Sequence, residues 1–176
     1  MEKIGLFYGS DTGYTEDIAA RIKKMWGDDQ IELHDIRDAE VADLMQYERL
    51  IIGTSTWNDG ELVSGWYDFY GKLDGVDFAG KTVALFGLGD QISYGEWYND
   101  AMGILGCKIR GKGATLIGSW PTDGYHFASS KAVESGRFIG LAIDEINQPK
   151  ETHRRLEQWI AVVRGEFSAH RSVAFN

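Results

Sequence analysis

Three short stretches of the sequence combine glycine with hydroxyl, carboxyl or aromatic side chains in patterns that suit ligand binding. The first, which we call the phosphate loop, is residues 9–15, Gly-Ser-Asp-Thr-Gly-Tyr-Thr, between an apolar segment and a helical pattern. Backbone N–H groups and the positive end of the dipole at a helix start attract anions, and hydroxyl groups can donate to anion oxygens. The phosphate loop therefore suits a phosphate group, although the same residue types also form ordinary helix N-caps.

The other two stretches bring aromatic rings to turns. The tryptophan loop is residues 54–61, Thr-Ser-Thr-Trp-Asn-Asp-Gly-Glu, and it places Trp57 before three residues that tolerate positive φ. The tyrosine loop is residues 87–94, Gly-Leu-Gly-Asp-Gln-Ile-Ser-Tyr, and ends on Tyr94. Two aromatic side chains that face one crevice indicate a flat ring held between them, whereas a lone tryptophan is more often part of a core.

Several other kinds of site do not match the sequence. The phosphate loop lacks the Gly-Lys-Ser/Thr ending that binds nucleoside triphosphates. No Gly-x-Gly-x-x-Gly dinucleotide motif follows residues 4–8. The four histidines show no metal-ligand spacing, so we interpret them as surface residues and expect no metal site. No catalytic residues are assigned, since no Gly-x-Ser-x-Gly elbow occurs.

These loops need a scaffold that brings them to one edge. Strand-sized apolar and β-branched segments recur at residues 4–8, 31–36, 50–54, 82–88 and 114–118. Helical periodicity separates them, as in residues 15–26, and returns at residues 156–167. This alternation predicts an α/β fold, a doubly wound five-stranded parallel sheet with helices on both faces. Ligands bind such sheets at the carboxyl ends of the strands, where all three loops are expected.

Length, composition and charge limit the kinds of protein that this chain can be. The chain has 176 residues, 43% of them hydrophobic, which predicts a single domain over residues 1–176. A net charge of −9 argues against nucleic acid as a partner. Neither a secretory signal nor an apolar run of about 18 residues occurs, so we expect a cytoplasmic monomer without membrane association. The single cysteine, Cys107, is interpreted as a buried packing residue.

Together and in order, the three loops resemble those of long-chain flavodoxins, and the likeness covers essentially the whole chain. The family's Ser/Thr-x-Thr-Gly-x-Thr, Thr-Trp-x-x-Gly and Gly-x-Gly-Asp-Gln patterns are matched at residues 10–15, 56–60 and 87–91. Residues 94–97 and 120–125 are most similar to the second flavodoxin of enteric-type bacteria. Two residues depart from the family pattern: Tyr14 stands where lysine is common, and Trp97 where asparagine often occurs.

The resemblance also implies an insertion at residues 119–138 that splits the fifth strand, which should resume over residues 139–143. Proline, glycine and serine in this insertion are typical of a loop.

In function, the resemblance implies a low-potential one-electron carrier with non-covalently bound FMN that cycles between semiquinone and hydroquinone. An NADPH-dependent flavodoxin reductase would be the donor and an unidentified redox enzyme the acceptor. The phosphate loop would hold the FMN phosphate, Trp57 and Tyr94 would stack on the isoalloxazine, and the peptide between Asn58 and Asp59 would rotate on reduction. The implied cofactor-binding residues are Ser10, Asp11, Thr12, Gly13, Tyr14, Thr15, Ser55, Thr56, Trp57, Asn58, Asp59, Gly60, Leu88, Gly89, Asp90, Tyr94 and Asp144.

Within this set the resemblance gives particular roles to two aspartates. It directs Asp90 toward the pyrimidine end of the flavin and places Asp144 near the flavin without a defined contact.

Two alternatives share the expected fold. A response-regulator receiver needs an acidic pair after the first strand and a phosphoacceptor aspartate after the third, and these places hold Gly9-Ser10 and Gly53-Thr54. An FMN-dependent quinone or azo reductase is the stronger alternative, but it needs an open substrate pocket over the flavin.

Acidic residues gather in sequence around the three loops. They form either a solvated rim or a field that lowers the second reduction potential of a bound flavin. They are Asp59, Glu61, Asp68, Asp90, Glu96, Asp100, Asp123, Asp144 and Glu145.

Overall fold

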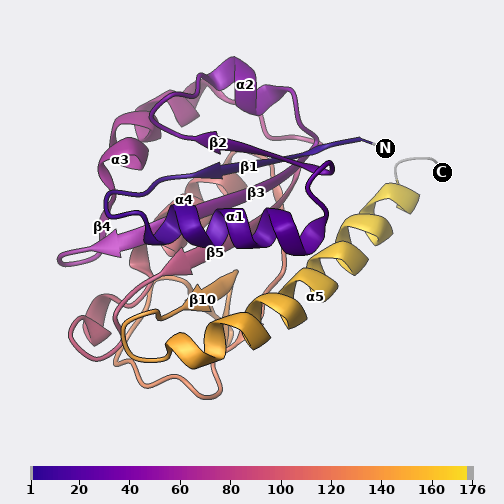
Figure 1. Ribbon diagram of the computed structural model, residues 1–176. Coiled ribbons are helices and arrows are strands. Elements are labelled where there is room, and N and C mark those ends of the chain that lie inside the picture. The colour runs from indigo at the N-terminus through magenta and orange to yellow at the C-terminus, as the bar shows by residue number, and fades with distance from the viewer. Residues whose placement is uncertain (1, 174–176) are drawn as a thin grey trace.

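The computed structural model describes residues 2–173, and a mostly parallel sheet forms its centre (Figure 1). The strands follow the order β10-β5-β3-β1-β2. Their bounds are β1 (Ile4–Tyr8), β2 (Ile31–Asp35), β3 (Arg49–Trp57), β5 (Thr82–Leu88), β6 (Thr115–Ile117) and β10 (Leu141–Ile143). A short strand, β4 (Glu61–Leu62), runs antiparallel to the end of β3. The predicted doubly wound α/β sheet is confirmed.

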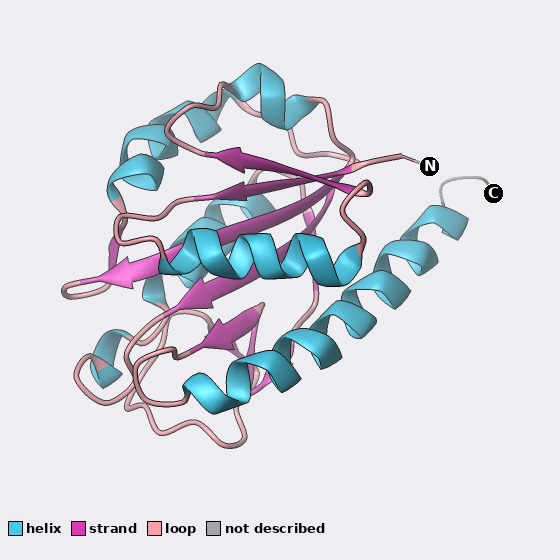
Figure 2. Cartoon of the chain, in the orientation of Figure 1, coloured by secondary structure: helices cyan, strands magenta, loops and turns pink. Residues whose placement is uncertain are grey.

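Helices cover both faces of the sheet (Figure 2). On one face α1 (Tyr14–Trp26) and α5 (Thr152–Val173) lie side by side, and on the other lie α3 (Ser64–Tyr70) and α4 (Asp100–Gly111). A single-turn helix, α2 (Val41–Met45), belongs to the connection between β2 and β3. The contact between α1 and α5 is aromatic: the ring of Trp26 packs edge-on against Phe167, with 6.1 Å between centroids.

The core fixes the strand ends from which the loops leave. Strands β1 and β5 are buried almost throughout, as is β3 up to Thr54, because helices cover both sheet faces. On α3, Trp66 is 0% exposed and its Nε1–H donates to the Gly53 carbonyl oxygen at 2.8 Å. The same indole lies against Gly9, where a Cβ atom would approach it to 2.4 Å. Trp66 thereby holds the phosphate loop and the tryptophan loop at their starting points.

Two short strands share the fifth position of the sheet. Strand β6 pairs with residues 82–84 of β5, and β10 pairs with residues 86–88. The predicted split of the fifth strand is confirmed, although the strand resumes at Leu141 and not at residue 139.

The insertion differs from the expected loop. Within it, β7 (Trp120–Pro121), β8 (Val133–Glu134) and β9 (Arg137–Phe138) form a small antiparallel sheet in the order β7-β9-β8. Strands of two residues are too short to produce a visible alternation of apolar and polar residues. The sequence therefore shows only the turn residues between them.

Two side chains are not where the sequence analysis placed them. Cys107 is exposed, because α4 turns Met102, Leu105 and Ile109 toward the core and leaves Cys107 outside that face. His34 is half-buried: its ring stacks on Phe7 with 4.4 Å between centroids. Among residues 2–173, no helix is both long enough and apolar enough to cross a membrane.

Candidate functional site

A pocket of about 310 Å³ opens at the carboxyl ends of β1, β3, β5 and β10. This volume lies in the range of small-molecule sites. The three loops predicted to carry chemistry therefore meet at one place, as expected for a doubly wound sheet. The pocket is lined by Thr12, Tyr14, Ser55, Thr56, Trp57, Asn58, Leu88, Gly89, Asp90, Tyr94, Glu145 and Ile146.

Two large aromatic side chains of the pocket wall remain open to solvent. Trp57 is 38% exposed and Tyr94 is 47% exposed, although most aromatic residues of the chain are buried. The turn after Trp57 has positive φ at Asn58 (44°) and Gly60 (91°). At Gly60 the space is also limited, since a Cβ atom would lie 2.8 Å from a carboxylate oxygen of Asp100. The tryptophan loop is thus held in a shape that presents its indole to the pocket.

The phosphate loop offers hydrogen-bond donors at the start of α1, one of which has no partner among the described residues. The first intrahelical bond of α1 runs from the Asp17 N–H to the Gly13 carbonyl oxygen at 3.0 Å, so the N–H groups of the preceding turn lack intrahelical acceptors. Thr15 is 1% exposed, and its Oγ1 has no hydrogen-bond partner among the described residues. A buried hydroxyl without a partner costs about 1–3 kcal/mol. These donors suit an anionic group at the start of α1.

Other predicted site residues shape the loops and do not line the pocket. The Ser10 hydroxyl oxygen accepts a hydrogen bond from the Gly13 N–H at 3.0 Å. The Asp11 carboxylate accepts one from the Ser64 hydroxyl at 2.6 Å and so joins the phosphate loop to α3. The members of the predicted set that the structure leaves out of the wall are Ser10, Asp11, Gly13, Thr15, Asp59, Gly60 and Asp144.

The pocket wall also contains two residues outside the predicted cofactor-binding set, Glu145, which the sequence analysis placed only in the acidic rim, and Ile146. Both come just after Asp144, the residue that follows β10, and Ile146 is 60% exposed. The rule about carboxyl strand ends, applied to the fifth strand as it was to the first, third and fourth, would have found them.

The predicted acidic rim is smaller than the sequence suggested, because two of its members are buried. Asp144 is 0% exposed and Asp100 is 2% exposed. Burial raises the pKa of Asp100, and a hydrogen bond of 2.7 Å from the Lys131 N–H offsets this only in part. These two carboxylates belong to the framework beneath the pocket.

By contrast, Asp90 lines the pocket and is partly open to solvent. Partial burial raises its pKa, but hydrogen bonds from the Ser93 N–H at 2.8 Å and from Asn147 Nδ2 at 2.8 Å hold the pKa below its ordinary value. Asp90 therefore supplies a fixed negative charge at this wall.

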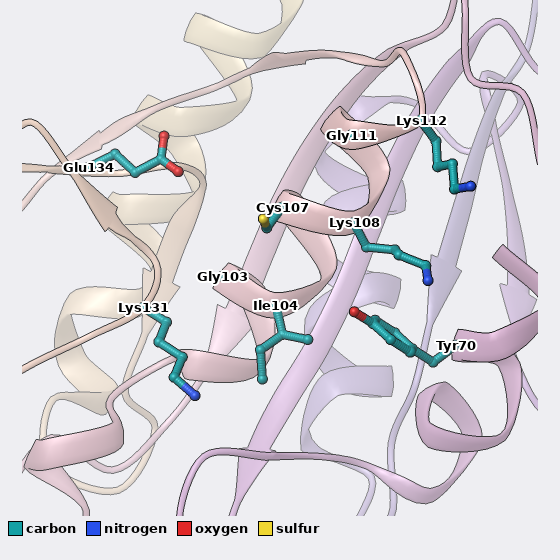
Figure 3. A pocket seen from close by; sticks show the side chains of 9 residues that line it. All are labelled: Tyr70, Gly103, Ile104, Cys107, Lys108, Gly111, Lys112, Lys131 and Glu134. Atoms are coloured by element: carbon teal, nitrogen blue, oxygen red, sulfur yellow. The ribbon is translucent and has the colours of Figure 1, made fainter. Parts of the chain in front are cut away.

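Two other pockets are less suited to ligand chemistry. One of about 580 Å³ lies beside α4, where Cys107, Lys108 and Lys131 line it (Figure 3). Its Lys108 is already paired with Asp74. Among the described residues, none of its lining side chains is a buried polar group without a partner. The other, of about 450 Å³, is lined by Trp97 and by residues 91–93 of the tyrosine loop, and among the described residues it too has no buried polar side chain without a partner.

Comparison with known proteins agrees with this geometry. Residues 6–159 match the family model described as Flavodoxin. A flavodoxin of Nostoc sp. is 52% identical over 166 residues, which cover 94% of this chain and 98% of that relative. Flavodoxin 1 of Salmonella typhimurium is 47% identical over 167 residues, covering 94% and 95%.

Among solved structures, Fusobacterium nucleatum flavodoxin bound to flavin mononucleotide superposes with a TM-score of 0.90. It is 36% identical, and the match covers 94% of this chain and 99% of that one. The narrower likeness to the second flavodoxin of enteric-type bacteria stays a prediction. This chain belongs to the flavodoxin family.

Proposed function

We propose that this protein binds one FMN without a covalent link in the pocket of Trp57 and Tyr94 and carries single electrons between other proteins. The observation that carries this proposal is the pocket wall with two solvent-exposed aromatic rings, next to a loop whose buried Thr15 hydroxyl has no partner among the residues that the structure describes. The FMN bound to the Fusobacterium nucleatum relative supports it further.

Each part of the pocket has its own task in this proposal. The N–H groups of the phosphate loop, with the hydroxyls of Ser10 and Thr15, would hold the phosphate. Because Tyr14 replaces a lysine common in the family, backbone donors and the helix dipole would carry this binding without a nearby cation. Trp57 and Tyr94 would exclude water from the ring faces. The bound flavin supplies reversible one-electron chemistry.

Charge near the pocket supports a low reduction potential. Asp90 and Glu145 line the pocket, and Asp59 is exposed on the adjoining turn. One unit charge about 10 Å away contributes roughly 1.7 kcal/mol at an effective dielectric constant of 20, which is about 70 mV for one electron. Solvent and salt reduce this value for exposed carboxylates. Negative charge here opposes further negative charge on the flavin.

For partners, an NADPH-dependent flavoprotein reductase would be the electron donor, and redox enzymes would be the acceptors. The net charge of −9 suits donors and acceptors with basic docking surfaces.

An FMN-dependent quinone or azo reductase is the competing function. Absorbance during stepwise reduction of the FMN-loaded protein distinguishes the two. A carrier should accumulate a one-electron-reduced flavin with a long-wavelength band and should not oxidise NADPH with a quinone unless a reductase is added. Direct two-electron reduction together with NADPH-dependent quinone turnover would overturn the carrier proposal.

A further inference from the structure

Asp144 stands at the end of β10 as a fully buried carboxylate, 0% exposed. None of the ion pairs among the described residues includes it. Its charge is instead compensated by N–H donors, which is how a buried carboxylate avoids a large desolvation cost. Five donors reach it: Gln91 N–H (3.0 Å), Gln91 Nε2 (2.8 Å), Ile146 N–H (3.1 Å), Asn147 N–H (2.9 Å) and Asn147 Nδ2 (2.9 Å).

Gln91 extends this network into the insertion. It is 2% exposed, and its Oε1 accepts a hydrogen bond from the His126 N–H. Further hydrogen bonds join the insertion to the segment that follows Tyr94: the N–H groups of Ala128 and Ser129 donate to the Gly95 carbonyl oxygen at 2.8 and 3.0 Å. Residues 126–129 therefore run beside the segment that carries Tyr94.

Asn147 extends the network toward the pocket. Its Nδ2 donates to Asp144 Oδ2 at 2.9 Å and to Asp90 Oδ1 at 2.8 Å. Asp90 in turn accepts hydrogen bonds from the Ile92 and Ser93 N–H groups, which close the turn leading to Tyr94. A continuous chain of hydrogen bonds thus joins the insertion, Gln91, Asp144, Asn147 and the pocket wall.

We propose that Asp144 and Gln91 are positioning residues. They couple the packing of residues 126–129 of the insertion to the position of Asp90 and Tyr94 in the pocket wall. Asp144 acts through Gln91 and Asn147 and does not touch the ligand. An aspartate is needed because an ionised carboxylate only accepts hydrogen bonds, whereas an amide would turn its own N–H groups toward several of the donors. The flavin measurements below rest on the proposed FMN function.

Gln91→Glu is the sharpest test. It keeps the size of the side chain and an acceptor for the His126 N–H, but it replaces the Nε2 donor with a carboxyl oxygen 2.8 Å from Asp144 Oδ2. When it is protonated, the introduced carboxyl can still donate a hydrogen bond to Asp144. When it is ionised, its negative charge repels the Asp144 carboxylate. The other titratable and charged groups around this site are Asp90, Glu145, His126, Tyr98, Tyr125 and Arg155. Burial and the Asp144 charge raise the pKa of the introduced carboxyl.

The matched control is Gln158→Glu, which adds the same charge on the exposed face of α5. From about pH 5 to about pH 8, FMN affinity of Gln91→Glu should fall about tenfold or more relative to this control. Each unit by which the pKa of the introduced carboxyl is higher in the FMN complex than in the free protein corresponds to a tenfold change in affinity. In the FMN-free protein, amide hydrogen exchange of residues 126–129 should accelerate over the same range by more than it does in this control. If Gln91→Glu matches the control in both measurements, or only exchange changes, the coupling is refuted.

Asn147→Ala keeps the test valid if Gln91→Glu does not fold. Asn147 is exposed, and the variant removes the side-chain bridge while its backbone N–H remains. The visible circular dichroism of bound FMN should change, and affinity should fall several-fold. An unchanged spectrum and affinity would refute the proposal. Failure of the wild-type protein to bind FMN would refute the proposed function instead, and the exchange measurement would still decide whether the network holds the insertion.

Discussion

Thr15→Val should affect the free protein and the FMN complex in opposite directions. Valine keeps the shape of threonine and removes only the buried Oγ1 hydroxyl, which lacks a partner within residues 2–173. Leaving a buried hydroxyl unpaired costs about 1–3 kcal/mol, so its removal should stabilise the FMN-free protein by up to that amount. A hydrogen bond to a charged phosphate contributes about 1.5–3 kcal/mol, so FMN affinity should fall roughly tenfold to a hundredfold.

Urea unfolding of the FMN-free protein and calorimetry with FMN and riboflavin measure both effects. The wild-type protein should prefer FMN to riboflavin, and the valine variant should lose part of that preference. Thr152→Val is the contrasting control, because Thr152 is also buried but its hydroxyl donates to Glu145, so the loss of this hydroxyl should destabilise the free protein. If Thr15→Val destabilises the free protein and weakens FMN and riboflavin equally, the assignment of the phosphate site is wrong.

Three further predictions concern charge and backbone conformation. Asp59→Gly should raise the first reduction potential relative to Asp59→Asn, because glycine adopts positive φ without the steric cost of a Cβ; equal potentials in redox titrations would contradict rotation of the Asn58–Asp59 peptide. Electron uptake from a basic reductase should slow as salt rises, and a flat dependence in stopped-flow experiments would place the −9 charge away from the docking face. Because burial raises the pKa of Asp100 in the folded state, wild-type stability should fall relative to Asp100→Asn as pH rises from about 4 to about 7. Urea unfolding that shows the same difference at both pH values would contradict this.

Sequence reasoning found the parts of the pocket that are local in the chain. The phosphate, tryptophan and tyrosine loops each combine a strand end with turn residues within a few positions, so their residue types alone indicate their place. Ten residues of these three loops line the pocket. The split of the fifth strand could also be predicted, because it came with the family resemblance.

Contacts between distant segments could not be predicted. Asp144 and Gln91 are 53 positions apart, and no periodicity links them. Asp144 was therefore predicted to lie near the ligand, and its place in a buried hydrogen-bond network was not foreseen. Cys107 was misplaced for a related reason. Its helix is apolar enough to suggest burial, but whether a given position faces the sheet depends on how α4 is rotated against β3 and β5.

The shared fifth strand has a consequence for how this chain can be altered. Because β6 and β10 divide the length of β5 between them, the sheet edge is paired on both sides of the interruption. The segment between Ile117 and Leu141 can be lengthened at little cost, since doubling a flexible loop adds only about 0.6 kcal/mol to its closure free energy. Chain entropy thus hardly opposes a longer segment between these two strands. This junction is therefore a natural grafting point, where a foreign segment could be inserted without rebuilding the sheet, while Gly140, whose Cα leaves no room for a Cβ beside the Leu85 carbonyl oxygen, would have to be kept.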